Sequence, residues 1–159
     1  MAARTARTSP AAAARVARAP AARRSPRRCA TRAAELPAVA DSAASPDELR
    51  AAPFDTALVI DVRDDAELEK EGAVVIEGSV HVPLNKDGRK QSDDPTTMDE
   101  FAAKCTAAGA LPDDKNAPII THCGRGGRGQ KAKVLLTEMG YTQVINGGNA
   151  EYIAAVRAM

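Results

Sequence analysis

Four short runs of β-branched and other apolar residues predict the strands of a sheet. They span residues 56–61 (TALVID), 79–82 (SVHV), 118–122 (PIITH) and 143–146 (QVIN). Apolar residues dominate these runs without strict alternation, which is typical of strands that are buried on both faces. Polar or turn-forming residues close each run, so we expect the strands to be short.

Helical windows separate the predicted strands. The segment SPDE at residues 45–48 has the form of a capping box with Pro at the first helical position, and Pro53 ends the helix that it opens. Thr97 caps a helix whose i, i+3, i+4, i+7 positions form one apolar face, made of Met98, Phe101, Ala102 and Cys105. Further helices are predicted over residues 64–71, 130–139 and 150–159.

Strands that alternate with helices predict an α/β fold with a mostly parallel central sheet and helices on both faces. The 159 residues suit one domain of ordinary size. The longest apolar run, AVVI at residues 73–76, is far shorter than the roughly 18 to 20 residues that a membrane-crossing helix needs. We therefore expect no membrane partner.

Composition divides the chain into two parts. Residues 1–34 hold nine Arg and no acidic residue, whereas residues 35–159 hold 13 basic and 21 acidic residues. An acid-free segment rich in Arg, Ala and Ser, without a large apolar stretch, is typical of an organelle transit peptide. We expect a transit peptide or disordered arm over residues 1–40 and a folded domain over residues 41–159.

Three prolines, Pro10, Pro20 and Pro26, would interrupt a long amphipathic helix in the N-terminal segment. Because mitochondrial presequences are recognised as such helices, we favour a chloroplast address, with the mitochondrion as the alternative. A basic arm that binds nucleic acid is a further interpretation of the segment. The acidic domain itself lacks the positive charge that a nucleic-acid partner requires.

A glycine-rich loop follows the third predicted strand and opens a helix. Its cysteine is Cys123, and the six residues after it are Gly124, Arg125, Gly126, Gly127, Arg128 and Gly129. The glycines let the backbone turn its N–H groups inward, and the start of a helix adds partial positive charge, so the loop is a candidate anion site. A Cys beside two arginines and a helix start favours the reactive thiolate.

Other templates fit this loop less well. The spacing of Gly124, Gly126 and Gly129 matches the dinucleotide fingerprint, but no acidic residue follows at the end of the next strand. The string RGGRG resembles RNA-binding segments, but it occurs once and within an acidic domain, so RNA binding is disfavoured. The two histidines, His81 and His122, have no metal-ligand spacing with the cysteines, so we expect no metal and no cofactor.

The strongest rival is a Cys-dependent phosphatase or arsenate reductase, because the pair His122-Cys123 begins the pattern His-Cys-x5-Arg. Only four residues separate Cys123 from Arg128, and the position that the pattern requires is Gly129. One residue fewer makes a smaller cradle. The spacing therefore favours a single sulfur atom carried on the cysteine, which needs less room than a tetrahedral phosphate.

Taken together, the motifs resemble a single-domain rhodanese over residues 56–156. The family's loop pattern Cys-x-x-Gly-x-Arg is matched by Cys123, Gly126 and Arg128. Its N-terminal signature is matched by DVR at residues 61–63, and its later Gly-Gly by residues 147–148. Thiosulfate-using members commonly carry Arg at the place of Gly124, whereas mercaptopyruvate-using relatives have Gly there, so the donor stays open.

The resemblance implies a sulfurtransferase that carries sulfane sulfur on a Cys123 persulfide, from a small-molecule donor such as thiosulfate to a thiol or cyanide. Glutathione or a thioredoxin-like protein would be the thiol acceptor. Residues 124–129 would bind the substrate, with Arg128 on its anionic end, and Asp61 and Arg63 would support the loop. We expect His122 and Cys105 to be core residues; the alternatives are that His122 lies near the thiolate and that Cys105 acts as a resolving thiol. The alternative is a non-catalytic rhodanese module that binds a partner or senses oxidants.

Overall fold

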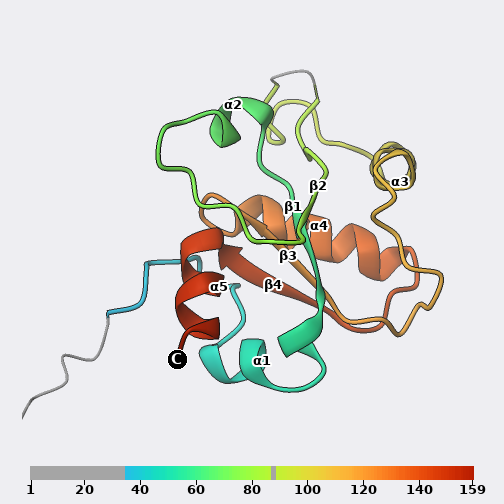
Figure 1. The fold of residues 1–159 in the computed structure, drawn as a ribbon. Coiled ribbons are helices and arrows are strands. Elements are labelled where there is room, and N and C mark those ends of the chain that lie inside the picture. The colour runs from blue at the N-terminus through green and yellow to red at the C-terminus, as the bar shows by residue number, and fades with distance from the viewer. Residues whose placement is uncertain (1–34, 87–88) are drawn as a thin grey trace, which may run out of the picture. The chain divides into compact units, whose positions relative to one another are not determined.

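The computed structural model of the chain describes residues 35–86 and 89–159 (Figure 1). The segment that carries the predicted transit peptide lies almost wholly outside these residues, so the chloroplast address stays a prediction. The described residues make up one compact unit. Within the described part, no helix has the length and the apolar character that crossing a membrane would require.

The centre of the domain is a parallel four-stranded sheet. Its strands are β1 (Leu58–Asp61), β2 (Val80–His81), β3 (Ile119–Cys123) and β4 (Val144–Asn149). Their order is β2-β1-β3-β4, and all neighbouring strands run parallel. The prediction of a mostly parallel sheet is confirmed. β4 runs three residues beyond the predicted end at Asn146.

In the described part of the chain, five α-helices and one 3₁₀ helix accompany the sheet. They are α1 (Pro46–Arg50), η1 (Phe54–Thr56), α2 (Asp65–Leu68), α3 (Met98–Ala107), α4 (Gly127–Glu138) and α5 (Ala150–Arg157). A complete capping box opens α1 at Ser45, as predicted, and Thr97 caps α3, as predicted, in a second complete capping box. Asn149 ends β4 and caps α5 with its side chain, which accepts a hydrogen bond from the Tyr152 N–H at 2.7 Å.

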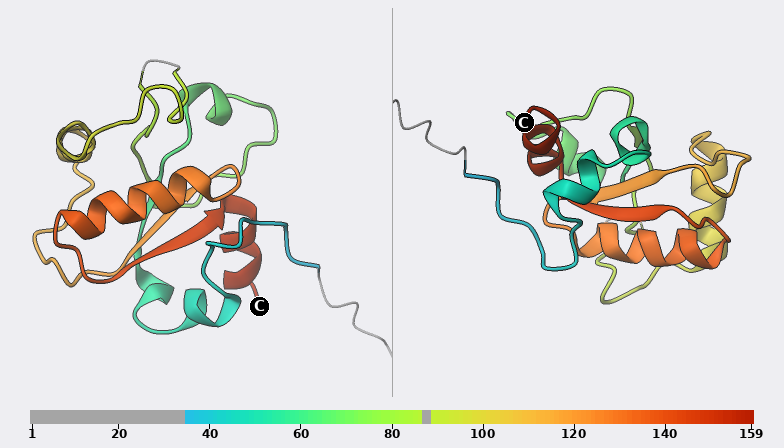
Figure 2. Two further views of the ribbon diagram at one scale, coloured as in Figure 1. Left: turned by 180° about the vertical axis from the view of Figure 1, so that it is seen from behind. Right: turned by 90° about the horizontal axis from the view of Figure 1, so that it is seen from below.

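Two apolar clusters sandwich the sheet. Ile119 of β3 faces the cluster that contains Phe101 and Leu136, whereas the next residue, Ile120, faces the cluster that contains Leu49 and Ile153. Figure 2 shows the corresponding layers, with α4 on one side of the sheet and α1 and α5 on the other. All five residues of β3 are buried, because the strand is covered on both faces, so buried and exposed positions do not alternate along it. The predicted helices on both faces are confirmed.

The structure corrects three details of the predicted helices. The helix predicted over residues 64–71 has only one turn, Asp65–Leu68, because no residue on it is buried. The helix predicted from Gln130 begins at Gly127 instead, so the last residues of the glycine-rich loop belong to its first turn. Met98 is 40% exposed, so the buried face of α3 consists mainly of Phe101 and Cys105.

Residues 35–44, which we call the strap, pack against the domain ahead of α1. Leu36, Val39 and Ala44 contact the cluster that contains Leu49 and Ile153. Backbone hydrogen bonds join Ala44 N–H to the Asn146 carbonyl at 2.7 Å and Ala40 N–H to the Arg125 carbonyl at 2.9 Å. The predicted boundary between residues 40 and 41 therefore falls inside a packed segment.

Candidate active site

The glycine-rich loop lies at the carboxyl end of the parallel sheet, where β3 ends and α4 begins. Cys123 is the last residue of β3, and only residues 124–126 separate it from the helix. Asp61, the last residue of β1, pairs in register with His122 and so lies at the same edge. The fold thus gathers polar residues from β1, α2 and the loop around one cysteine, as parallel sheets commonly do.

Cys123 is 2% exposed and lines a pocket of about 510 Å³. The Gly126 N–H donates a hydrogen bond to Cys123 Sγ at 3.1 Å. Gly126 has φ of 108°, in the left-handed region that favours glycine, so this turn requires Gly at that position. Of the loop amides, Gly126 N–H is the one that contacts the sulfur.

The loop residues do not share one environment. Gly124 and Arg125 are exposed, Gly126 and Gly129 are buried, and Gly127 and Arg128 lie in the first turn of α4. A Cβ on Gly129 would lie 2.6 Å from Asn146 Oδ1, so β4 packs directly against the start of the helix. The predicted loop residues are therefore brought together, but Gly129 faces the core rather than the pocket.

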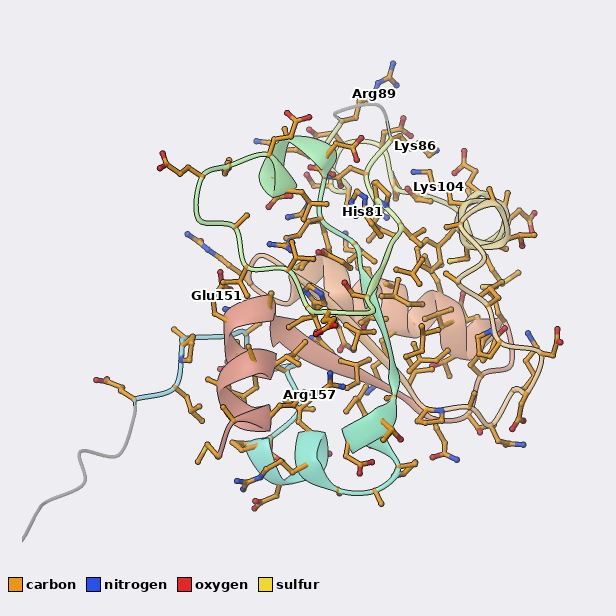
Figure 3. All side chains as sticks on the ribbon, viewed as in Figure 1. His81, Lys86, Arg89, Lys104, Glu151 and Arg157 are labelled. Atoms are coloured by element: carbon orange, nitrogen blue, oxygen red, sulfur yellow. The ribbon has the colours of Figure 1, made fainter. Side chains whose placement is uncertain are left out.

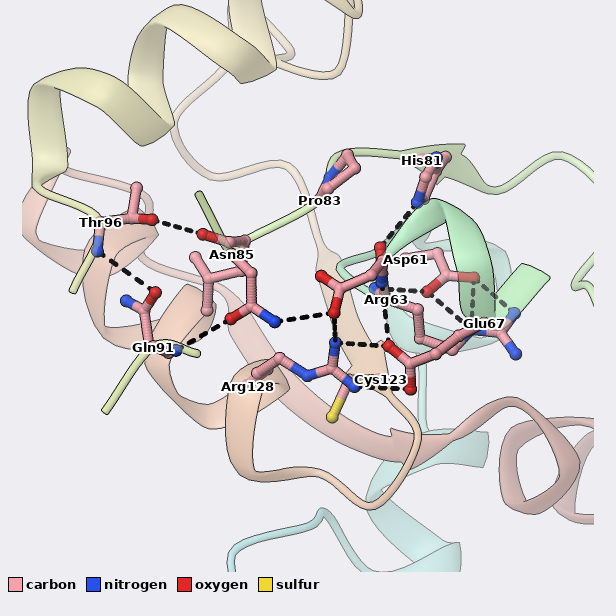
Figure 4. Close-up of polar contacts among 12 residues, drawn as sticks. Asp61, Arg63, Glu67, His81, Pro83, Asn85, Gln91, Thr96, Cys123 and Arg128 are labelled. Atoms are coloured by element: carbon pink, nitrogen blue, oxygen red, sulfur yellow. Dashed lines mark hydrogen bonds and ion pairs between the residues drawn. The ribbon is translucent and has the colours of Figure 1, made fainter. Parts of the chain in front are cut away.

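Arg128 lines the pocket and is paired with two carboxylates. Its two terminal nitrogens donate to the two carboxylate oxygens of Glu67 at 2.6 and 2.7 Å, and Nη1 lies 3.3 Å from Asp64 Oδ2 (Figure 4). The hydrogen bonds from Arg128 lower the pKa of Glu67 to about 2. The cation predicted to bind a donor is thus already paired with carboxylates of α2 and its N-cap.

Glu67 is the site residue that sequence reasoning missed. It lines the pocket together with Cys123, Arg125 and Arg128, and a Cβ on Gly124 would lie 3.2 Å from its Oε1. Glu67 also belongs to the capping box of α2, where it accepts a hydrogen bond from the Asp64 N–H at 3.0 Å. Because a capping box alone accounts for a Glu at this position in the sequence, the pair with Arg128 was not predicted.

Asp61 and Arg63 form a buried pair behind the pocket. Asp61 accepts hydrogen bonds from the Arg63 backbone N–H at 3.0 Å and from its guanidinium at 2.6 to 3.0 Å. Burial alone would raise the pKa of Asp61, but the hydrogen bonds from Arg63 outweigh it and lower the pKa. Arg63 also donates to the Val74 carbonyl at 2.9 Å. Both residues thus fix the backbone that follows β1.

The two residues predicted to be core residues are fully buried. His122 has no hydrogen-bond partner for either ring nitrogen among the described residues, and its Nε2 lies 3.8 Å from Asp61 Oδ2. Burial lowers the pKa of His122, which favours the neutral ring. Burial raises the pKa of Cys105 to about 11, so at neutral pH this thiol is protonated.

A second hollow lies beside α3, at the end of β2. Its wall includes Asp64, His81 and Lys104, and Figure 3 shows His81 and Lys104 on the same side of the molecule. The Lys104 ammonium donates to the Pro83 and Asn85 carbonyls at 2.9 Å each, and His81 Nε2 lies 2.7 Å from the Arg63 carbonyl. These groups are thus satisfied by backbone. In the described residues, no cluster of His, Cys, Asp or Glu could hold a metal ion.

Comparison with known families agrees with this arrangement. The rhodanese family, described as "Rhodanese-like domain", matches residues 45–155, well over half of the sequence. The chain belongs to the rhodanese-like domain family, which confirms the resemblance and the α/β fold.

Individual relatives are more distant. The chain is 32% identical over 95 residues to the thiosulfate sulfurtransferase PspE of Escherichia coli strain K12, a match that covers 60% of this chain and 72% of PspE. A solved structure described as a rhodanese with anions from E. coli is 29% identical, with a TM-score of 0.42 over 61% of this chain and 91% of its own. The human single-domain sulfurtransferase TSTD1 is 25% identical, with a TM-score of 0.40 over 62% and 81%.

Proposed function

We propose that this protein is a sulfurtransferase that carries sulfane sulfur on Cys123. The observation that carries the proposal is that Cys123 lines a pocket and that its Sγ lies 3.1 Å from the Gly126 N–H. A donor aimed at Sγ stabilises the Cys123 thiolate, both as the attacking group of the first step and as the leaving group of the second. The family and the name of the E. coli relative support the same chemistry.

The reaction has two steps. The Cys123 thiolate attacks the outer sulfur of a donor such as thiosulfate, the S–S bond of the donor breaks, and sulfite leaves with its electron pair. An acceptor thiolate then attacks the outer sulfur of the Cys123 persulfide, which releases the Cys123 thiolate and forms an acceptor persulfide. Cyanide as acceptor gives thiocyanate. Because each step is a nucleophilic displacement at a sulfane sulfur with no net oxidation or reduction, the reaction needs no cofactor.

The charges of the pocket bear on the donor. Arg128 is paired with Glu67 and lies near Asp64, whereas Arg125 is exposed and has no ion pair among the described residues. We propose that an anionic donor approaches past Arg125 and shares Arg128 with Glu67. The acceptor, which we propose to be a small thiol such as glutathione or a thioredoxin-like protein, would enter through the same opening.

Intact-mass measurement after incubation with thiosulfate tests the proposal. We expect the protein to gain one sulfur atom on Cys123 and to lose it when cyanide or a thiol is added. The Cys123→Ser variant should gain none, and Cys105→Ser, the matched control, should gain as much as the unchanged protein because Cys105 is buried away from the pocket.

The same preparation tests the rival function. A turnover of aryl phosphates that depends on Cys123 would show that the four-residue spacing to Arg128 does not exclude phosphatase chemistry. If neither sulfur uptake nor phosphate turnover is found, the proposal is wrong and the non-catalytic module is favoured.

A further inference from the structure

The strap reaches the loop that carries the reactive cysteine. Its backbone turns at residues 40–43, where the Ala43 N–H donates to the Ala40 carbonyl at 2.9 Å. On one side, Asn149 Nδ2 donates to the Ala38 carbonyl at 3.1 Å, and Val39 packs against Gly148 so closely that a Cβ there would lie 2.6 Å from Val39 Cγ1. The strap is thus seated on the end of β4.

On its other side, the strap contacts a single peptide group of the active-site loop. The Ala40 N–H donates to the Arg125 carbonyl at 2.9 Å, and the N–H of that same peptide, on Gly126, donates to Cys123 Sγ at 3.1 Å. In a trans peptide the C=O and the N–H point in opposite directions. Holding the carbonyl toward Ala40 therefore holds the N–H toward the sulfur.

The Arg125–Gly126 peptide needs a contact from outside the loop to keep this orientation, because it adjoins a glycine. Gly126 has φ of 108°, and a glycine accepts rotation of its neighbouring peptide groups more readily than any other residue. A hydrogen bond to the carbonyl also polarises the N–H of the same group and so strengthens the bond that it donates.

A side chain of β4 makes a second connection between the strap and the loop. Asn146 Nδ2 donates to the Gly126 carbonyl at 3.1 Å and to the Ser42 carbonyl at 3.2 Å. Asn146 Oδ1 accepts from the Gly148 N–H at 3.1 Å, which fixes the direction of the amide. The loop is thus attached to the strap on both sides of Gly126.

We propose that the strap is a positioning element of the active site, in which the Ala40 N–H orients the Arg125–Gly126 peptide onto Cys123. This inference rests on Cys123 being the reactive thiol but not on sulfur transfer itself. The charged side chains that line the pocket with Cys123 are Glu67, Arg125 and Arg128, and none of them belongs to the strap. A change in the strap can therefore alter the thiol without altering the charges of the pocket.

The test compares two proline substitutions in the full chain. Ala40→Pro deletes the N–H that holds the Arg125 carbonyl, whereas Ala38→Pro, the matched control, deletes an N–H without a hydrogen bond among the described residues. The measurement is the pH profile of Cys123 alkylation by iodoacetamide, followed by peptide mass spectrometry. For Ala40→Pro we expect the rate at pH 7 to fall about 5- to 10-fold and the midpoint to move to higher pH, because the thiolate loses an oriented donor.

A milder substitution, Val39→Ser, tests the same proposal if the Ala40→Pro variant does not fold. Val39→Ser leaves every backbone donor in place and weakens the packing of the strap on Gly148 and on the apolar cluster that contains Leu49 and Ile153. It should shift the alkylation profile in the same direction by a smaller amount. A lowered melting temperature with an unchanged alkylation profile, in either variant, would overturn the proposal and leave the strap a merely structural segment. Because alkylation needs no sulfur donor, this outcome is independent of the proposed reaction.

Discussion

Two arginine–carboxylate pairs lie at the same edge of the sheet and differ in almost every other respect. Asp61 and Arg63 are two residues apart, and their side chains are 2% and 7% exposed. Glu67 and Arg128 are 61 residues apart, at the mouth of the pocket, with side chains 26% and 19% exposed. The first pair holds the backbone after β1, whereas the second lines the pocket, where we propose that a substrate competes with Glu67 for Arg128. The difference in burial therefore predicts a structural role for the first pair and a functional role for the second.

The largest effect that we expect is on stability, from breaking the buried pair. Asp61→Asn removes the charge that compensates Arg63 and should lower the free energy of unfolding by about 3 kcal/mol, because Arg63 would remain buried without a counterion. Urea unfolding measures this loss. Asp47→Asn is the control, since the pair between Asp47 and Arg50 is exposed and should contribute less than about 0.5 kcal/mol. Equal losses in the two variants would contradict the distinction.

The pocket pair should instead control activity. Arg128→Ala leaves Glu67 and Asp64 uncompensated beside the thiolate, so an anionic donor is repelled. We expect kcat/KM for thiosulfate to fall about 10- to 150-fold, as for the loss of a charge-assisted hydrogen bond in the transition state. Steady-state kinetics with an uncharged persulfide donor provides the control, and there the loss should be smaller. Equal losses with both donors would mean that Arg128 shapes the loop rather than binding the donor.

A substitution of Glu67, the other member of the pocket pair, should have the opposite effect on donor binding. Glu67→Gln keeps a side chain of similar size but releases Arg128 from its strongest counterion. We expect KM for thiosulfate to fall about threefold, because the donor no longer competes with Glu67 for the charge-assisted hydrogen bonds of Arg128. Titration of the initial rate against thiosulfate measures it. A raised KM would show that Glu67 positions Arg128 productively and does not compete with the donor.

The smallest effect is a pH dependence of stability. The pKa of Glu67 is lowered from 4.5 to about 2 in the folded protein, so the pair stabilises the fold above pH 4.5 and loses this contribution as the pH falls toward 2. The melting temperature of the unchanged protein should therefore exceed that of Glu67→Gln at pH 6 and approach it near pH 2. Other acidic groups titrate in both proteins and cancel in the difference. A difference in melting temperature that does not change with pH would contradict the stabilisation of the fold by ionised Glu67.

The elements of the fold were predictable because their signals are local. Runs such as TALVID and PIITH are apolar enough to predict buried strands, and the capping boxes at Ser45 and Thr97 fix the starts of two helices. The start of α4 was predicted too late, at Gln130, because three residues of its first turn are Gly127, Arg128 and Gly129. Two glycines there disfavour a helix by propensity, and packing against Asn146 overrides that preference.

The site was predictable only in part. The cysteine and its loop are contiguous and could be found from spacing, whereas Glu67 reaches Arg128 only because β1 and β3 are neighbours in the sheet. The strap is the other feature that local patterns did not predict. Leu36 and Val39 are too few to define a periodicity, and the hydrogen bond of Ala40 involves a backbone N–H that every residue except proline has.

The strap has a further consequence, for solubility. β2 and β4 are the two outer strands of the sheet, and β2 has only two residues and so presents little unpaired backbone. β4 has six, and the Ala44 N–H of the strap occupies the outward Asn146 carbonyl while Asn149 reaches the Ala38 carbonyl. An uncovered strand edge is a template for pairing with other chains. A polypeptide that began after residue 44 would lose both contacts, expose this part of the edge and tend to aggregate.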